Sequence, residues 1–210
     1  MNNTARPDIY DRMARIISLL FHPLFMPVYG LVFLLNAPTF LRYLPVEAKK
    51  ILMFVLVINN VMIPIGLLMF FRYRHLISSY NIDDRNERIM PLLTTSILYC
   101  TTSFIIFRFQ VPFFIKSFIF ATSVVSIILS MINFWWKISI HSAAAGALTA
   151  TVLMLSFRMH TDLLWYLVAI ILISGVVISS RLRLNSHEPA QAWAGYATGF
   201  LGIVLFILLI

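Results

Sequence analysis

The chain has 210 residues, of which 60% are hydrophobic and only 11% are charged. Soluble domains contain about 25% charged residues, so this composition excludes an ordinary soluble domain and indicates an integral membrane protein. The net charge of +8 comes mostly from basic residues at the ends of apolar stretches. This placement favours lipid headgroups or a phosphorylated substrate as partners and argues against nucleic acid.

Apolar stretches long enough to cross a bilayer recur along the whole chain. A transmembrane helix needs about 20 residues, and the candidate spans cover residues 14–36, 50–71, 89–108, 111–133, 137–157, 162–180 and 189–210. The first contains Pro23 and Pro27, and a kinked, re-entrant or interfacial course is open for it. No linker or repeat interrupts the sequence. We therefore predict one domain over residues 1–210, an all-α integral membrane bundle of six to seven transmembrane helices.

A few polar residues are read as structural. Asn59 and Asn60 lie inside the second span, and we expect them to hydrogen-bond to neighbouring helices, because an amide in hydrocarbon lacks water as a partner. His22, His75 and His160 have no matching partners in the sequence, and we predict no functional role for them.

Three of the connections between spans are rich in polar residues. They cover residues 72–88, 133–137 and 181–187, and each follows an even-numbered span. Connections of the same parity emerge on the same side of a membrane. We therefore expect these three segments to contribute to one shared site.

The third of these connections contains the strongest candidate for a reactive residue, His187. If a helix begins near Asn185 or Ser186, His187 and Gln191 share one helix face. The side-chain carbonyl of Gln191 then accepts a hydrogen bond from one ring nitrogen of His187 and leaves the other nitrogen free to attack. Arg181 lies six residues before His187 and adds a guanidinium suited to phosphate oxygens.

The start of the fifth span carries a second ionisable pair. Lys137 and His141 are four residues apart, which makes them neighbours on a helix face. The small residues between Ser142 and Ala150 predict close approach of another helix. No cluster of carboxylate, His or Cys residues suggests a metal, and we expect no cofactor.

These segments resemble the motifs of the type 2 phosphatidic acid phosphatase (PAP2) superfamily. The third motif of that family is Ser-Arg, five residues, His, three residues and Asp; Ser180, Arg181 and His187 match it, and Gln191 stands where the family has Asp. Ser139 and His141 resemble the second motif, Pro-Ser-Gly-His, without its Pro and Gly.

The first motif of the family, a Lys followed after six residues by Arg-Pro, has a looser counterpart in Arg85, Arg88 and Pro91. The resemblance covers roughly residues 85–200. It implies a PAP2-like core and hydrolysis of a lipid phosphate or diphosphate, such as phosphatidic acid or a polyprenyl diphosphate. The implied nucleophile is His187 and the implied general acid is His141. The implied phosphate ligands are Arg181, Lys137, Arg88, Arg85 and Ser139.

The residue types favour the same chemistry on physical grounds. Cations around two histidines suit metal-free phosphoryl transfer, in which His187 attacks phosphorus and the cations offset the charge on the phosphate oxygens. An amide at position 191 orients His187 but adds no charge, so a slow enzyme, a base elsewhere (Glu188) and a non-catalytic lipid-phosphate binder or transporter stay open. A structural membrane protein is the remaining alternative.

The basic residues leave the orientation in the membrane open. Lys and Arg residues are more numerous on the side of the three polar connections, which by itself predicts a cytoplasmic site. Without the four proposed site cations the two sides are equal. The resemblance to PAP2 enzymes instead implies the bacterial inner (plasma) membrane, with the site on its extracytoplasmic face.

Overall fold

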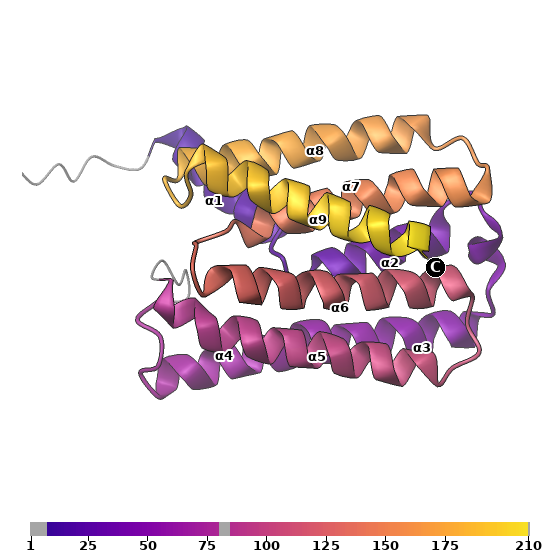
Figure 1. The fold of residues 1–210 in the computed structure, drawn as a ribbon, viewed down its shortest axis with the longest axis horizontal. Coiled ribbons are helices and arrows are strands. Elements are labelled where there is room, and N and C mark those ends of the chain that lie inside the picture. Colours follow the sequence, from indigo (N-terminus) through magenta and orange to yellow (C-terminus); the bar gives the residue numbers. More distant parts are fainter. Residues whose placement is uncertain (1–7, 80–84, 210) are drawn as a thin grey trace, which may run out of the picture.

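The structure is a computed structural model that describes residues 8–79 and 85–209. These residues form helices and no strand, and six helices are long and apolar enough to cross a membrane. The six cover Val46–Tyr73, Asn86–Phe107, Phe113–Asn133, Ile140–Met159, Leu164–Arg183 and Pro189–Leu209. Figure 1 shows them side by side with their long axes roughly parallel. The predicted all-α bundle and its last six spans are confirmed.

The predicted first span, residues 14–36, is instead two short helices, α1 (Ile9–Leu20) and α2 (Met26–Asn36). Pro23 and Pro27 explain the break, because proline lacks an N–H group and its ring clashes with a preceding helical turn. Pro27 is tolerated in the first turn of α2. In Figure 1, α1 lies at one end of the bundle and α2 runs toward the other end, where the short η1 helix (Phe40–Tyr43) follows.

The second span is interrupted by a π-helical turn. It consists of α3 (Val46–Val57), a π-helical turn η2 (Ile58–Met62) and α4 (Ile63–Tyr73). Within η2 the side-chain oxygen of Asn60 accepts a hydrogen bond of 2.6 Å from the Thr102 hydroxyl of α5 (Ile89–Phe107). The predicted helix bonding is confirmed for Asn60, whereas the buried amide nitrogen of Asn59 donates no hydrogen bond.

The most extensive contact between two described helices is that of α7 (Ile140–Met159) with α9 (Pro189–Leu209). Both helices carry small residues at the crossing, so their backbones approach closely. A Cβ atom built on Gly199 would overlap the carbonyl oxygen of Ala143, and one on Gly195 would overlap that of Ser139. The predicted close approach at Ser142–Ala150 is confirmed, and it fixes the start of α7 against the start of α9.

This packing predicts opposite effects for one substitution at two glycines. Gly199→Ala is expected to destabilise the protein by about 1–3 kcal/mol, because the added methyl group meets backbone that cannot rotate away. Gly175→Ala in α8 (Leu164–Arg183) is the matched control: a Cβ atom there meets nothing within 4 Å, so the better helix propensity of alanine is expected to stabilise by up to about 1 kcal/mol. Thermal unfolding in detergent measures both. Equal effects of the two substitutions would contradict the packing.

The described parts of the three polar connections lie together at one end of the bundle, whereas residues 80–84 of the first connection lie outside the described residues. Figure 1 shows that α4 ends and α5 begins, α6 (Phe113–Asn133) ends and α7 begins, and α8 ends and α9 begins on the left-hand side. The expected common side of these connections is confirmed. We call this side the polar end of the bundle.

Candidate active site

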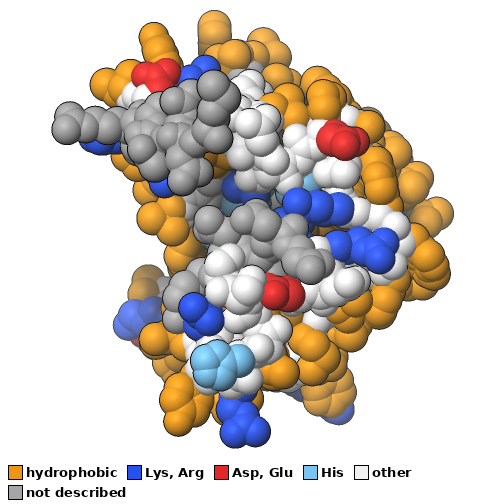
Figure 2. All heavy atoms as spheres, turned by 90° about the vertical axis from the view of Figure 1, so that its left-hand side faces the viewer, with side chains coloured by type: hydrophobic (Ala, Val, Ile, Leu, Met, Phe, Trp, Pro, Cys, Tyr) orange, Lys and Arg blue, Asp and Glu red, His pale blue; other side chains and the backbone are white. Residues whose placement is uncertain are grey.

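A cavity of about 190 Å³ opens inside the polar end of the bundle. Its wall combines apolar residues from α2 and from α4 to α7 with a group of ionisable side chains. This group consists of His22, Arg88, His141, Arg181 and His187. The described residues of the wall include two arginines, whose guanidinium groups are suited to bind an anion. Figure 2 looks onto this end and shows Lys and Arg side chains near its centre, with apolar side chains on the flanks.

His187 is held by the first turn of α9. Its Nδ1 atom lies 3.2 Å from Oε1 of Gln191, and the same oxygen accepts the Glu188 backbone N–H at 3.3 Å. Because the backbone N–H can only donate, it identifies this atom of Gln191 as the carbonyl oxygen, and Nδ1 of His187 must then carry the hydrogen. In the neutral ring the lone pair is consequently on Nε2. The predicted hydrogen bond between Gln191 and His187 is present.

The helix that makes this bond begins later than predicted. α9 starts at Pro189 rather than near Asn185 or Ser186, so His187 precedes the helix and does not share a helix face with Gln191. The geometry is one half of a capping box, in which a Gln side chain in the first turn reaches back to the backbone N–H of the cap residue, here Glu188. Gln191 therefore caps its own helix and orients His187 with one oxygen atom.

Burial and positive charge keep the His187 ring neutral. The side chain is only 7% exposed, and its pKa is lowered from 6.5 to about 3, first by burial and then by the charges of Arg88 and Arg181. Both effects disfavour a second proton on the ring. At neutral pH the Nε2 lone pair is thus available.

The two arginines of the cavity come from different helices. Arg181 lies in the last turn of α8, where a cation is favoured by the helix dipole. Arg88 ends the short η3 helix (Asn86–Arg88) just before α5, and it is 6% exposed. Together with His141 at the start of α7, these residues bring three distant parts of the sequence to one cavity.

Three predicted phosphate ligands do not line this cavity. Arg85 donates a hydrogen bond of 2.8 Å to the backbone carbonyl of Trp135. Ser139 is fully buried and caps α7, and its hydroxyl oxygen accepts the Ser142 hydroxyl at 2.9 Å. Lys137 was predicted to share a helix face with His141. It instead precedes α7, so the two residues do not share a helix face. It lines an adjoining shallow cleft with His187 and Gln191.

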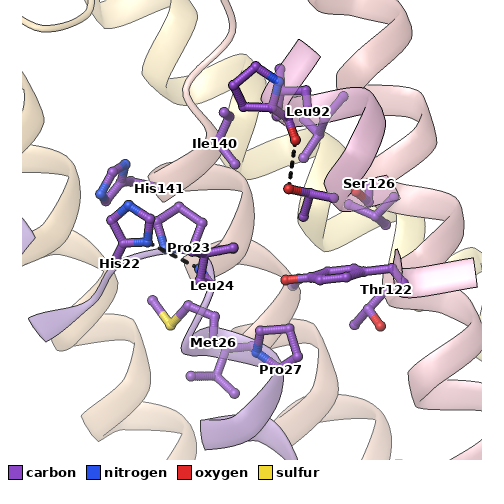
Figure 3. A pocket seen from close by; sticks show the side chains of 18 of the residues that line it. His22, Pro23, Leu24, Met26, Pro27, Leu92, Thr122, Ser126, Ile140 and His141 are labelled. Atoms are coloured by element: carbon purple, nitrogen blue, oxygen red, sulfur yellow. Dashed lines mark hydrogen bonds between the residues drawn. The ribbon is translucent and has the colours of Figure 1, made fainter. Parts of the chain in front are cut away.

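His22, which was predicted to have no role, lines the cavity. It lies at the break between α1 and α2, and its ring centroid is 5.4 Å from that of His141. Figure 3 shows the two rings next to each other, with Thr122 and Ser126 on the opposite wall. A histidine next to a proline inside an interrupted apolar span was the available signal. The other two histidines predicted to have no role, His75 and His160, do not line the cavity.

The lowered pKa of His187 predicts how stability depends on pH. Above pH 6.5 the ring is neutral in both folded and unfolded chains. As the pH falls below 6.5, the unfolded chain binds the proton and the folded chain does not until about pH 3, so the free energy of unfolding falls by about 1.4 kcal/mol per pH unit. His187→Asn removes this contribution, and its thermal midpoint should fall less between pH 6 and pH 4. The exposed His160, replaced by Asn, is the control and should behave as the wild type. Parallel curves for wild type and His187→Asn would contradict the prediction.

No protein-family model, curated protein or solved structure matches this chain. The resemblance to the PAP2 superfamily therefore depends on the motif residues alone, and the function has to be argued from the site.

Proposed function

We propose that this membrane protein is a phosphatase of the PAP2 type that hydrolyses a lipid phosphate or diphosphate through a phosphohistidine, without a metal ion. The observation that carries the proposal is the meeting of His187, His141, Arg88 and Arg181 in one cavity. Two guanidinium groups are suited to an anion with several oxygens. A neutral histidine whose free lone pair is fixed by Gln191 is suited to attack the phosphorus atom.

Each side chain has one role in the proposed reaction. Nε2 of His187 attacks phosphorus, the P–N bond forms, and the P–O bond to the lipid breaks. His141 takes up the proton of the singly ionised phosphate group and gives it to the departing oxygen, while Arg88 and Arg181 offset the negative charge on the phosphate oxygens. Water then attacks phosphorus, the P–N bond breaks, and His141 takes a proton from the water and passes it to the phosphate product. The products are inorganic phosphate and the lipid alcohol from a lipid phosphate, or inorganic phosphate and the lipid monophosphate from a diphosphate.

The apolar part of the cavity supports a lipid as the substrate. Leu92, Phe118, Leu129 and Leu148 line it beyond the ionisable group. The volume of about 190 Å³ is smaller than the roughly 300–1,000 Å³ of typical ligand pockets. It therefore suits the phosphate end of a lipid and the first part of its chain, while the rest of the chain stays in the bilayer. The proposal includes the bacterial plasma membrane, with the site on its extracytoplasmic face, as PAP2 enzymes imply.

A second candidate is a lipid-phosphate binder or transporter that has lost turnover. The specific observation in its favour is Gln191, because an amide orients His187 but adds no charge to stabilise the positive ring of a phosphohistidine. A binder or transporter is expected to bind lipid phosphates as the proposed phosphatase does, but to release no phosphate from them.

Phosphate release distinguishes the two candidates. Purified wild-type protein in detergent is incubated with phosphatidic acid, phosphatidylglycerol phosphate or a polyprenyl diphosphate, in the presence of EDTA. Glycerol phosphate, which has no chain, is the control substrate. The proposal predicts release from at least one lipid and much less from glycerol phosphate. Binding of these lipids by folded protein without any release would favour the binder instead.

A further inference from the structure

The break between α1 and α2 forms part of the cavity wall. His22, Pro23 and Leu24 all line the cavity, and turn-type hydrogen bonds, such as Phe25 N–H to the His22 carbonyl at 2.9 Å, replace the helical pattern there. In a bundle of membrane-spanning helices, irregular backbone is tolerated where it is buried in protein or lines a cavity. The break between α1 and α2 therefore forms part of the candidate site as well as connecting the two helices.

His22 has a defined ring orientation. The Leu24 backbone N–H lies 3.4 Å from Nδ1 of His22, a long hydrogen bond in which Nδ1 is the acceptor. In the neutral ring the hydrogen is consequently on Nε2. Burial and the charge of Arg181 lower the pKa of His22 to about 4, which keeps the ring neutral at physiological pH. Figure 3 shows the bond to Leu24 on one side of the ring and His141 on the other.

His141 is held from two sides by the same N-terminal segment. Its Nε2 atom lies 3.2 Å from the carbonyl oxygen of Ser18 in the last turn of α1. A carbonyl can only accept, so Nε2 is the donor and Nδ1 is left to exchange a proton with a substrate. On the other side, the His22 ring meets the His141 ring edge to face, at 82° between the ring planes. Such ring pairs have a preferred geometry, so His22 restricts how His141 can turn.

We propose that His22 is a positioning residue, which together with the Ser18 carbonyl fixes the tautomer and orientation of His141. The inference rests on the proposed phosphatase function, because it gives His141 the role of proton donor. His22 itself exchanges no proton in either step. Proton transfer goes through Nδ1 of His141, which holds the lone pair of the neutral ring. It takes the proton of the singly ionised substrate phosphate and gives it to the departing lipid oxygen. It later takes a proton from the attacking water and passes it to the phosphate product. The α1–α2 segment thus completes a site whose other residues come from the three polar connections.

The first test is His22→Asn. The Asn side-chain oxygen can still accept the Leu24 N–H, so the turn is kept while the ring is lost. Correct placement of a general acid contributes about 10²–10⁴-fold to a rate, and a misplaced His141 is expected to retain part of this. We therefore expect kcat to fall about 10- to 100-fold, with KM changed by less than about threefold. His160→Asn is the control: His160 ends α7 in the left-handed conformation that Asn tolerates, and it should keep wild-type kcat.

A second readout does not depend on turnover. Nitrogen NMR of protein labelled at its histidines reports which ring nitrogen carries the hydrogen, and loss of a signal in His141→Asn assigns that signal. The wild type should show His141 with the hydrogen on Nε2, and His22→Asn should show a mixture of both tautomers. An unchanged His141 signal or an unchanged kcat in His22→Asn would overturn the inference. If the wild type releases no phosphate, the proposed function is wrong. The NMR result then tests by itself whether His22 fixes the tautomer of His141.

Discussion

Replacement of His187 by alanine is expected to lower the rate of phosphate release by at least about 10⁴-fold. Loss of an enzyme nucleophile removes the covalent route entirely, and losses of about 10⁶-fold are known for such residues. The structure gives the physical reason: His187 is the cavity histidine whose Nδ1 hydrogen is fixed by Gln191, which leaves Nε2 with the lone pair. Initial rates of phosphate release in detergent, with EDTA present, measure the effect.

Two controls distinguish loss of the nucleophile from unfolding of the His187→Ala variant. The exposed His75 follows α4 in the left-handed conformation and does not line the cavity, so His75→Asn should keep full activity. The thermal midpoint of His187→Ala at pH 7 should stay within a few degrees of the wild type, because among the described residues the ring hydrogen-bonds to one side chain, that of Gln191. Activity that survives in folded His187→Ala would rule out His187 as the nucleophile.

Replacement of Arg181 by glutamine is expected to lower kcat/KM about 10²–10³-fold, the loss typical when a fixed donor to a developing charge is removed. Arg181 lines the cavity, and its charge lowers the pKa of both His22 and His187. It is therefore near both rings and near any phosphate placed between them. Arg181→Lys should recover part of the loss, because lysine keeps the charge but not the two-pronged donor geometry. Steady-state kinetics with the best lipid substrate give the comparison.

Arg183 provides a matched control two residues along the same helix. Its guanidinium does not line the cavity and forms ion pairs of 2.9 Å with Asp8 and Asp11, which join α8 to the start of α1. Exposed ion pairs contribute about 0–1 kcal/mol to stability. Arg183→Gln should therefore cost little activity. Equal losses of kcat/KM for Arg181→Gln and Arg183→Gln would contradict a role of Arg181 as phosphate ligand. They would show that activity depends on the total positive charge at the end of α8.

Much of the fold was predictable because membrane helices have strong sequence signals. Apolar length identified the six spans, and their parity predicted that the three polar connections meet at one end. The bond between His187 and Gln191 was predictable as well, since it depends on residues close in the chain. The small residues from Ser142 to Ala150 correctly indicated a close helix crossing.

The remaining features depend on contacts between distant segments. Arg85 matched a motif position, but its side chain binds the Trp135 carbonyl, an arrangement that no local pattern encodes. Ser139 became a helix cap because α7 begins at Ile140, later than the apolar pattern suggested. His22 gained a place in the cavity only because Pro23 and Pro27 break the first apolar stretch and turn its chain inward. Its partner His141 lies far away in the sequence.

The covalent intermediate tests the central claim most directly. Protein mixed with a lipid phosphate that is labelled at phosphorus is quenched in alkali, digested and sequenced by mass spectrometry. Phosphohistidine is stable in alkali and labile in acid, so the account predicts an alkali-stable, acid-labile phosphoryl group on His187. The group should appear before phosphate is released and should be absent from His187→Ala. Phosphate release without any such group on His187, or with the group on another residue, would contradict the account.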